Sequence, residues 1–255
     1  MNVFITGASS GIGEALARYY ATRSATVGLF ARREVELARI AADMSAVRTI
    51  TYAGDVRDST ALAQAGSDFI ERCGTPDIVI ANAGVSHGTL TEHPEDQRVF
   101  DTILATNVSA TVATFAPFIA TMKTQASARR LVGIGSVAGI RGLPGAGAYS
   151  ASKAAVLCYC ESLRIELRAS GIEVVTIAPG YIATPMTEQN AYPMPFLMPV
   201  ERFASAAVRA IARGDSYRVI PWQMGVVAKL LRLLPNWLYD LALSRAPHKA
   251  RKEAL

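Results

Sequence analysis

The sequence of 255 residues is poor in the residues that build disulfide frameworks and metal sites. The number of cysteines is odd, and their spacing is not that of a metal site: they are Cys73, Cys158 and Cys160. There are also only three histidines. Cys158 and Cys160 are two residues apart on a predicted helix, so they do not share a face. We therefore expect free thiols in a reducing compartment, no disulfide-stapled fold and no bound metal.

Charged residues are also scarce, at 18% of the chain, whereas 51% of the residues are hydrophobic. This balance excludes an intrinsically disordered chain. The net charge of +5 is spread along the sequence until the basic end, His248-Lys249-Ala250-Arg251-Lys252. No basic patch with interleaved aromatics precedes that end, so no nucleic-acid partner is predicted. A modest excess of cations suits an anionic cofactor.

Long hydrophobic runs are absent too. No uninterrupted apolar stretch reaches the roughly 18 to 20 residues that span a bilayer. The strand-like run Asn2–Thr6 comes at the very start, and no charged and apolar leader with a cleavage site precedes it. We therefore expect a cytoplasmic protein.

Short runs rich in β-branched and apolar residues alternate with helical segments along the chain. Most of these runs are nearly continuous in apolar residues, which is typical of strands buried on both faces. Helical patterns lie between them, around residues 12–22, 34–44, 59–72, 95–122, 149–169 and 201–213. The alternation predicts one α/β domain over residues 1–255, a doubly wound Rossmann fold with a seven-stranded parallel sheet. The predicted strands are Val3–Thr6, Thr26–Phe30, Arg48–Thr51, Ile78–Ala81, Leu131–Ile134, Glu173–Ile177 and Tyr217–Ile220.

A glycine-rich turn follows the first predicted strand and opens the first helix. Glycines allow a sharp turn and let the backbone approach a pyrophosphate, and the helix N-terminus offers free N–H groups to that anion. A purely structural turn is the alternative, but the place between strand and helix favours cofactor binding. The candidate residues are Gly7, Ser9, Ser10, Gly11, Ile12 and Gly13.

The second predicted strand is followed by Ala31, Arg32 and Arg33. An acidic residue here would bind a ribose 2′-hydroxyl, whereas arginine accommodates a 2′-phosphate. Guanidinium groups bind phosphate in a bidentate manner. NADP(H) is therefore the preferred cofactor, with NAD(H) as the alternative. The two arginines could instead simply begin a solvated helix.

Tyr149 and Lys153 are four residues apart, so on a helix they lie on one face. Carbonyl reduction needs an acid and alcohol oxidation needs a base, and a nearby ammonium lowers the pKa of a tyrosine toward that use. Ser136 follows the fifth predicted strand, where its hydroxyl can polarise a substrate carbonyl. The three residues predict a hydride-transfer site.

Taken together, the glycine spacing G-x-x-x-G-x-G, the Tyr149-x-x-x-Lys153 pair and Ser136 resemble the classical short-chain dehydrogenase/reductase family, up to about residue 220. The resemblance implies a nicotinamide cofactor and a fourth catalytic residue, Asn107, which would kink its helix and hold a water near Lys153. It also implies that Lys153 binds the ribose of the cofactor. Ser10 departs from many NADP-preferring relatives, which have a basic residue there.

The resemblance also extends the cofactor site beyond the glycine-rich turn. It implies that Asp55, in Gly54-Asp55-Val56, contacts the adenine, although an aspartate here could also be an ordinary helix cap. A turn after the fourth strand would line the cofactor, and a segment after the sixth would seal the nicotinamide side. The residues so implied are Asp55, Val56, Asn82, Ala83, Gly84, Tyr149, Lys153, Pro179, Gly180, Ile182 and Thr184.

The substrate side is less clearly encoded. Residues 185–199 combine methionines, prolines and Phe196, a composition that fits a substrate lid or an ordinary packed loop. His87 could reach the pocket mouth. We expect a small carbonyl or alcohol substrate of apolar character.

A helical extension over residues 224–245, interrupted by Pro235, carries a narrow polar stripe. Because so little of its surface is polar, we expect the extension to be buried on most sides. A homodimer or homotetramer interface, a cover over the pocket, and contact with a membrane surface compete as explanations. The stripe consists of Lys229, Arg232, Asn236 and Asp240.

Two other functions compete with catalysis by this site. A cofactor-sensing regulator would keep the fold without the chemistry, but such proteins typically lose the tyrosine or the lysine. An epimerase or dehydratase of the extended branch would have another glycine spacing and a larger substrate domain. The sequence favours the oxidoreductase.

Overall fold

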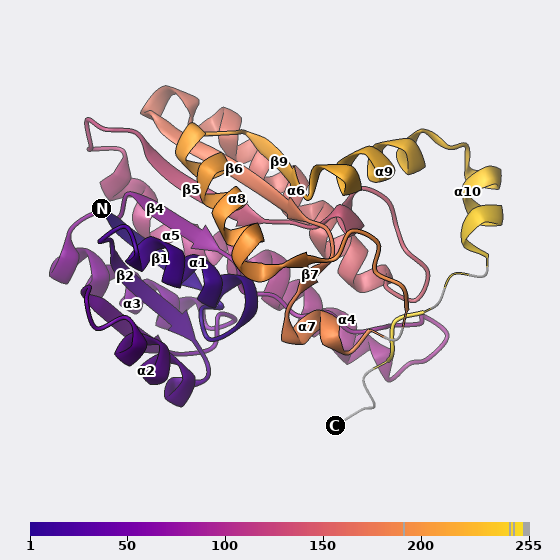
Figure 1. Cartoon of the computed structure of the whole chain (residues 1–255), viewed down its shortest axis with the longest axis horizontal. Helices are drawn as coiled ribbons and strands as arrows, with labels where there is room; N and C mark the ends of the chain where they lie inside the picture. The colour runs from indigo at the N-terminus through magenta and orange to yellow at the C-terminus, as the bar shows by residue number, and fades with distance from the viewer. Residues whose placement is uncertain (191, 245, 247, 252–255) are drawn as a thin grey trace.

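A parallel seven-stranded sheet forms the centre of the computed structural model, which describes residues 1–190, 192–244, 246 and 248–251 (Figure 1). The strand order is β3-β2-β1-β4-β5-β6-β9, so the order reverses between β1 and β4. Ligands of such sheets bind beyond the carboxyl ends of the strands near this reversal. The strands are β1 Asn2–Thr6, β2 Thr26–Ala31, β3 Thr49–Ala53, β4 Ile78–Ala81, β5 Arg129–Ile134, β6 Ile172–Pro179 and β9 Tyr217–Ile220.

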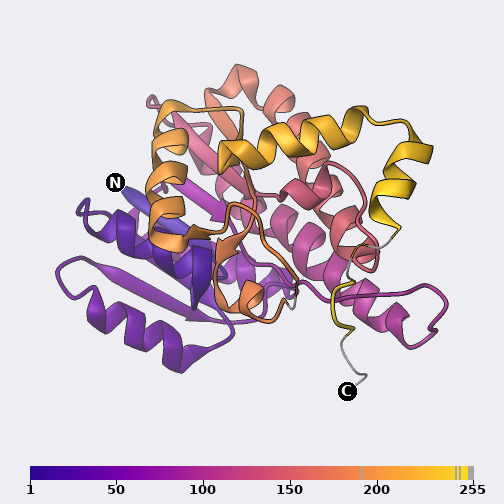
Figure 2. The same ribbon diagram turned by 45° about the vertical axis from the view of Figure 1, so that its right-hand side comes forward.

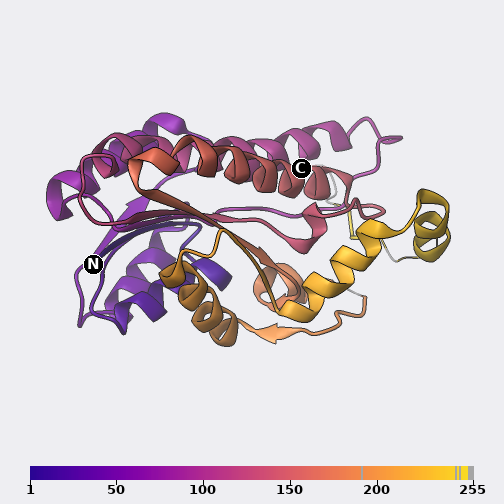
Figure 3. The ribbon, with the colours of Figure 1, turned by 90° about the horizontal axis from the view of Figure 1, so that it is seen from above.

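Helices cover both faces of the sheet, and seen from above they form a layer on each side (Figure 3). One layer holds α1 (Gly11–Ala21), α2 (Glu34–Asp43) and α8 (Val200–Arg213). The other holds α3 (Ser59–Cys73), α5 (Ala110–Met122) and α6 (Gly147–Glu166). Helix α4 (Asp96–Leu104) runs into α5 through a π-helical turn, η1 (Ala105–Ser109), and two 3₁₀ turns are η2 (Val137–Gly139) and η3 (Arg168–Ser170). The predicted doubly wound fold is confirmed.

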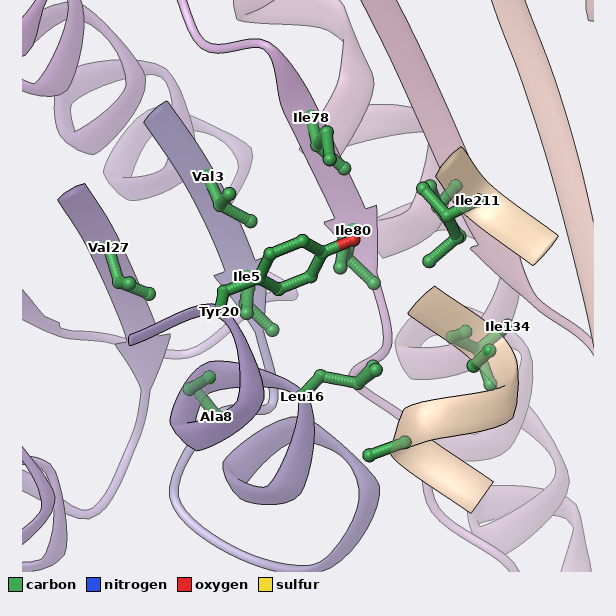
Figure 4. Packing of buried hydrophobic residues seen from close by; sticks show 14 of the residues in the cluster. Val3, Ile5, Ala8, Leu16, Tyr20, Val27, Ile78, Ile80, Ile134 and Ile211 are labelled. Carbon is green, nitrogen blue, oxygen red and sulfur yellow. The ribbon is translucent and has the colours of Figure 1, made fainter. Parts of the chain in front are cut away.

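Each layer has its own hydrophobic core against the sheet. In the first, Leu16 and Tyr20 of α1 lie over Ile5 and Ile80 at the centre of the sheet, with Ile211 of α8 beside them (Figure 4). The second is rich in aromatics, and the ring centre of Phe4 on β1 lies 5.5 Å from that of Phe69, edge to face, and 5.0 Å from that of Phe118. Both cores hold β1 and β4 in place from either side, which fixes the loops that leave their carboxyl ends.

Most predicted elements agree with the structure to within two residues at each end, and two differences have clear physical causes. The third strand was expected at 48–51 but is Thr49–Ala53, an edge strand in which only Ile50 is fully buried. A search for apolar runs therefore ends it too early. The helix expected over 95–122 is continuous in space but contains the π-helical turn at its middle.

The helix Asp96–Met122 is long and apolar enough, by length and composition, to cross a membrane, with mean hydropathy 1.5. The expectation above rested on uninterrupted apolar runs, and polar residues such as Thr106 and Asn107 interrupt this helix. Phe115, Phe118 and Met122 on it are fully buried in the second core. Its apolar character is therefore that of a core helix packed against the sheet.

After β9 the chain leaves the sheet in a helical pair, α9 (Trp222–Leu233) and α10 (Asn236–Leu243), here called the C-terminal arm (Figure 2). The break lies at Leu234 and Pro235, as the proline predicted. Arg141 holds the joint, because its guanidinium donates to the Leu234 carbonyl (2.7 Å) and to Asn236 Oδ1 (3.0 Å). The ring of Tyr239 packs on the same guanidinium at 3.7 Å.

The predicted burial of this arm on most sides is wrong for the single chain. Leu230, Leu233, Trp237 and Leu241 are between 60% and 80% exposed, and Trp222 is 69% exposed. Only Met224, Gly225 and Ala228 of α9 and Tyr239 of α10 are buried. The polar stripe distinguished a polar face of the arm from an apolar face. It did not show whether the apolar face is covered by this chain or by another molecule.

Candidate active site

A cavity of about 950 Å³ opens at the carboxyl ends of the parallel strands, on both sides of the reversal in strand order. Its walls hold all the residues predicted for the cofactor except Gly13, and all those predicted for catalysis except Asn107. His87 also lines it. The predicted residues on its walls are Gly7, Ser9, Ser10, Gly11, Ile12, Arg32, Arg33, Asp55, Val56, Asn82, Ala83, Gly84, Ser136, Tyr149, Lys153, Pro179, Gly180, Ile182 and Thr184.

The glycine-rich turn forms one end of the cavity. Gly7 and Gly11 have φ of +67° and +56°, a region that costs other residues energy. Gly13 lies behind the turn, and a Cβ there would overlap the carbonyl oxygen of Gly7 and come within 2.6 Å of Asn82 Nδ2. The Asn82 amide donates to the carbonyls of Thr6 (3.0 Å) and Gly7 (3.2 Å). The turn is thus held against the end of β4, and its backbone faces the cavity.

Arg32, Arg33 and Arg57 bring three guanidinium groups to the cavity wall beyond the glycine-rich turn. Arg33 donates to Ser9 Oγ (3.0 Å) and to the Ser9 carbonyl (3.1 Å), which ties the end of β2 to the turn. Arg57 was not predicted, although it lies two residues after Asp55 in the same loop. Arg57 is paired with Asp55, so Arg32 and Arg33 are the cations that make this end of the cavity suited to a phosphorylated ligand.

Asp55 lines the cavity but is already paired. Its carboxylate accepts from the Arg57 side chain at 2.6 Å and 3.0 Å, which lowers the pKa of Asp55. The alternative interpretation of Asp55 as a helix cap is wrong. The cap of α3 is Asp58, which accepts from the backbone N–H groups of Thr60 (2.9 Å) and Ala61 (3.0 Å).

Tyr149 and Lys153 lie one turn apart on α6 and face the cavity with Ser136, which follows β5. Lys153 is 5% exposed, and its Nζ donates to the Ile134 carbonyl at 2.8 Å and lies 5.8 Å from the centre of the Tyr149 ring. Burial lowers the pKa of Lys153 to about 8. The sequence predicted that these side chains meet, and the structure brings them together.

The expected lowering of the Tyr149 pKa is not found. Burial raises the pKa of this phenol above its ordinary value, and a hydrogen bond with Ser136 opposes that rise. Desolvation penalises the phenolate more than one hydrogen bond can offset. Tyr149 is therefore protonated at neutral pH and lies next to a serine hydroxyl.

Asn107 does not line the cavity but lies directly behind it, 1% exposed, in the π-helical turn η1. Its amide donates to the Val85 carbonyl (3.0 Å) and to Ser152 Oγ (2.9 Å), and its Oδ1 accepts from Val85 N–H (2.8 Å). The predicted irregularity of this helix is therefore present, as a π-helical turn of the kind often found at functional sites. Asn107 connects the loop after β4 to α6, and so supports the helix that carries Tyr149.

The segment after β6 closes the opposite side. Thr184 caps the short helix α7 (Pro185–Glu188) through a reciprocal capping box with Thr187. A Cβ on Gly11 would lie 3.3 Å from Thr184, so the segment abuts the glycine-rich turn. Strand β7 (Ile182–Ala183) pairs with β8 (Met198–Pro199), which closes the 185–199 loop at its base. Whether this loop acts as a lid stays a prediction.

Part of the substrate side was not visible in the sequence. Helix α4 contributes Arg98, Val99 and Thr102 to the cavity wall. Met186 of the 185–199 loop also lines it, whereas Phe196 is 50% exposed to solvent. No motif marks the α4 residues, because their position depends on how the loop after β4 folds back over the strand ends.

Comparison with known proteins decides the family. The family model for short chain dehydrogenases matches residues 1–193. The chain belongs to the short-chain dehydrogenase family. An oxidoreductase of Myxococcus xanthus, described as uncharacterized, is 37% identical over 243 residues, which cover 94% of this chain and 95% of the relative. The protein is thus a short-chain dehydrogenase/reductase enzyme.

Solved structures agree on the fold of this dehydrogenase. A short-chain dehydrogenase/reductase of Burkholderia phymatum in complex with NAD superposes with a TM-score of 0.82 at 23% identity, covering 99% of this chain and 98% of that one. An alcohol dehydrogenase of Thermococcus sibiricus in complex with 5-hydroxy-NADP gives a TM-score of 0.77 at 24% identity, covering 86% and 95%. Both superpositions show that this chain has the fold of these two enzymes.

Proposed function

We propose that this dehydrogenase catalyses NADP(H)-dependent, reversible hydride transfer between the nicotinamide and a carbonyl or secondary alcohol substrate, with Tyr149 as acid and base. One observation carries the proposal. The Tyr149 phenol, the Ser136 hydroxyl and the Lys153 ammonium converge on a cavity whose far end is the glycine-rich turn with its arginines. A redox cofactor and a proton donor would share this one space.

The cavity fits a phosphorylated dinucleotide in shape and charge. The glycine-rich turn is a cradle that a Cβ at Gly13 would fill, and α1 begins at Gly11 with its free N–H groups directed at the cavity end. Arg32 and Arg33 would hold the 2′-phosphate of NADP(H), in preference to the bare ribose of NAD(H). Lys153 and the turn at Asn82 would hold the nicotinamide half.

When bound, the cofactor supplies the hydride in reduction and takes it up in oxidation. In reduction, Tyr149 Oη donates its proton to the oxygen that becomes the alkoxide, and the Ser136 hydroxyl orients that oxygen. The raised pKa of Tyr149 keeps this proton in place at neutral pH. Lys153, with its pKa near 8, is mostly a cation at neutral pH and stabilises the phenolate that forms.

The test replaces Tyr149 with phenylalanine, which removes only the hydroxyl. Turnover should fall by about 10²- to 10⁴-fold, the usual contribution of a general acid, while cofactor affinity stays within about twofold. Tyr159→Phe is the matched control, because Tyr159 lies on the same helix and stacks on Phe115 in the core. Turnover is measured by cofactor oxidation over aldehydes, ketones, steroids and acyl-chain ketones. Near-normal turnover in Tyr149→Phe would overturn the mechanism.

The same screen decides the cofactor and the rival function. The ratio of kcat/KM for NADPH and NADH should favour NADPH, and a clear preference for NADH would contradict the role given to Arg32 and Arg33. A purified protein that binds the cofactor tightly but turns over no carbonyl or alcohol would instead be a cofactor-sensing regulator. Its intact Tyr149 and Lys153 argue against that outcome.

A further inference from the structure

The described end of the chain, residues 248–251, returns from the C-terminal arm and lies beside α4 (Figure 1). We call these residues the C-terminal strap. Gly88 N–H donates to the Ala250 carbonyl at 2.9 Å, and Gly88 forms a parallel bridge with Arg251. On the other side a Cβ at Gly145 would come within 2.7 Å of His248. The strap therefore contacts both loops that flank Tyr149.

A bidentate ion pair anchors the strap. Arg251 Nε and Nη2 donate to the two carboxylate oxygens of Asp96 at 2.8 Å and 3.0 Å, and Nη2 also donates to Glu95 at 2.8 Å. Asp96 is only 3% exposed, and it accepts a further bond from the Leu90 N–H at 2.8 Å. Arg251 lowers the pKa of Asp96, so the pair stays charged at neutral pH. The strap thus has a fixed place in the fold.

The anchored strap brings a second lysine to the catalytic tyrosine. Lys249 Nζ lies 5.9 Å from the centre of the Tyr149 ring, and Lys153 Nζ lies 5.8 Å from the same centre. Lys249 Nζ donates to Ser86 Oγ at 2.8 Å, and Ser86 lies between two residues that line the cavity, Val85 and His87. Lys153 has a role in the proposed hydride transfer, whereas Lys249 has none so far.

The surroundings of Lys249 suit an anion. The side chain is half-buried, and burial lowers its pKa. None of the ion pairs among residues 1–190, 192–244, 246 and 248–251 involves it, and its hydrogen bond is to an uncharged hydroxyl. A cation kept from water without a counter-ion is costly, and a bound carboxylate would offset that cost.

We propose that Lys249 binds the carboxylate of the substrate, and that the substrates are oxo acids and the matching hydroxy acids. This inference rests on the proposed function. Since Lys249 Nζ lies 5.9 Å from the centre of the ring whose hydroxyl would protonate the carbonyl oxygen, we expect a short spacer between the acid and the carbonyl, as in 2-oxo and 3-oxo acids. In reduction the carbonyl carbon gains the hydride from the cofactor, its oxygen gains the Tyr149 proton, and the carboxylate is unchanged.

The experiment compares 2-oxo and 3-oxo acids with their methyl esters, pairs that differ in charge but not in the reacting group. Wild-type enzyme should prefer the acid of at least one pair. Lys249→Met should lower kcat/KM for that acid by about 10- to 100-fold, mainly through KM, because a charge-assisted hydrogen bond is lost. The ester should change by less than about twofold, and Lys249→Arg should recover most of the activity on the acid.

Two controls separate the possible failures. Lys123→Met removes an exposed lysine at the end of α5 and should change neither substrate. Cofactor binding, followed by fluorescence titration, should be the same in all variants. Equal losses on acid and ester in Lys249→Met, or a wild-type enzyme that reduces other ketones but prefers no acid, would overturn the inference alone. A wild-type enzyme that binds the cofactor but reduces no carbonyl would overturn the proposed function as well.

Discussion

The cofactor half of the molecule and its C-terminal part differ in how they are built. From β1 to β6 the functional residues follow buried strands, and the two cores fix those strands from both faces. From α9 onward, large apolar side chains such as Leu233 and Trp237 are exposed, and the arm is held to the body by Arg141 and the end of the chain by the strap. The family model matches residues 1–193 and thus ends before the arm and the strap.

This difference separates the residues proposed for the reaction from those proposed for substrate selectivity and association. Under the proposed function, the matched part would set the chemistry, because hydride transfer needs the same glycine-rich turn and the same proton donor for any substrate. Under the further inference, the later part would set substrate selectivity and association, and it lies outside the region that the family model matches. If that division is right, substitutions in the first part should abolish activity, and those in the second should change only selectivity or association.

The largest effect is expected from Gly13→Val, which tests the cofactor half. The new Cβ would overlap the Gly7 carbonyl oxygen and crowd Asn82 Nδ2, so the turn would have to move. Overlap with backbone costs about 3 kcal/mol or more, which corresponds to a loss in cofactor affinity of about 100-fold. Fluorescence titration with NADPH measures it, and circular dichroism checks the fold. Gly142→Ala is the control, because no atom lies within 4 Å of its Cβ position.

A Gly13→Val variant that bound NADPH as tightly as wild type would show that the glycine-rich turn does not bind the cofactor in the way proposed. If Gly13→Val does not fold, the milder substitution Gly13→Ala tests the same prediction. The predicted direction is the same for both.

The sequence predicted the first half well for a physical reason. Apolar runs mark strands buried on both faces, and side chains that follow parallel strands must meet at one edge of the sheet, so Ser136, Tyr149 and Lys153 could be placed together. Local spacing could not place Lys249, because Ser86 lies 163 positions away in the chain and the contact depends on the path of the arm. It also missed Arg57 and could not show which face of the arm is covered.

A smaller effect is expected from Arg33→Ala, within the same half. Arg33 donates to Ser9 in the free chain and would also bind the 2′-phosphate, so its loss should weaken NADPH binding by about 10- to 100-fold. NADH binding should change much less, because NADH lacks that phosphate. Arg39→Ala is the control, since Arg39 is exposed on α2 and pairs with Glu36. Equal weakening of both cofactors would mean that Arg33 only supports the turn.

The smallest effect on catalysis is expected from the C-terminal arm, where Leu233→Glu places a charge on its exposed apolar face. Leu233 is 80% exposed and lies near Trp237 in the chain, and a face of this kind marks an interaction surface. We expect the wild-type enzyme to be a homodimer or homotetramer through this face, and Leu233→Glu to shift it toward monomer in sedimentation. Turnover per active site should stay within about twofold, because the cavity walls do not include the arm.

Val35→Glu is the control, as Val35 is equally exposed but lies on α2. If oligomer size is unchanged while binding to anionic liposomes falls, the face contacts a membrane, and if kcat/KM for bulky substrates falls with neither, it covers the pocket.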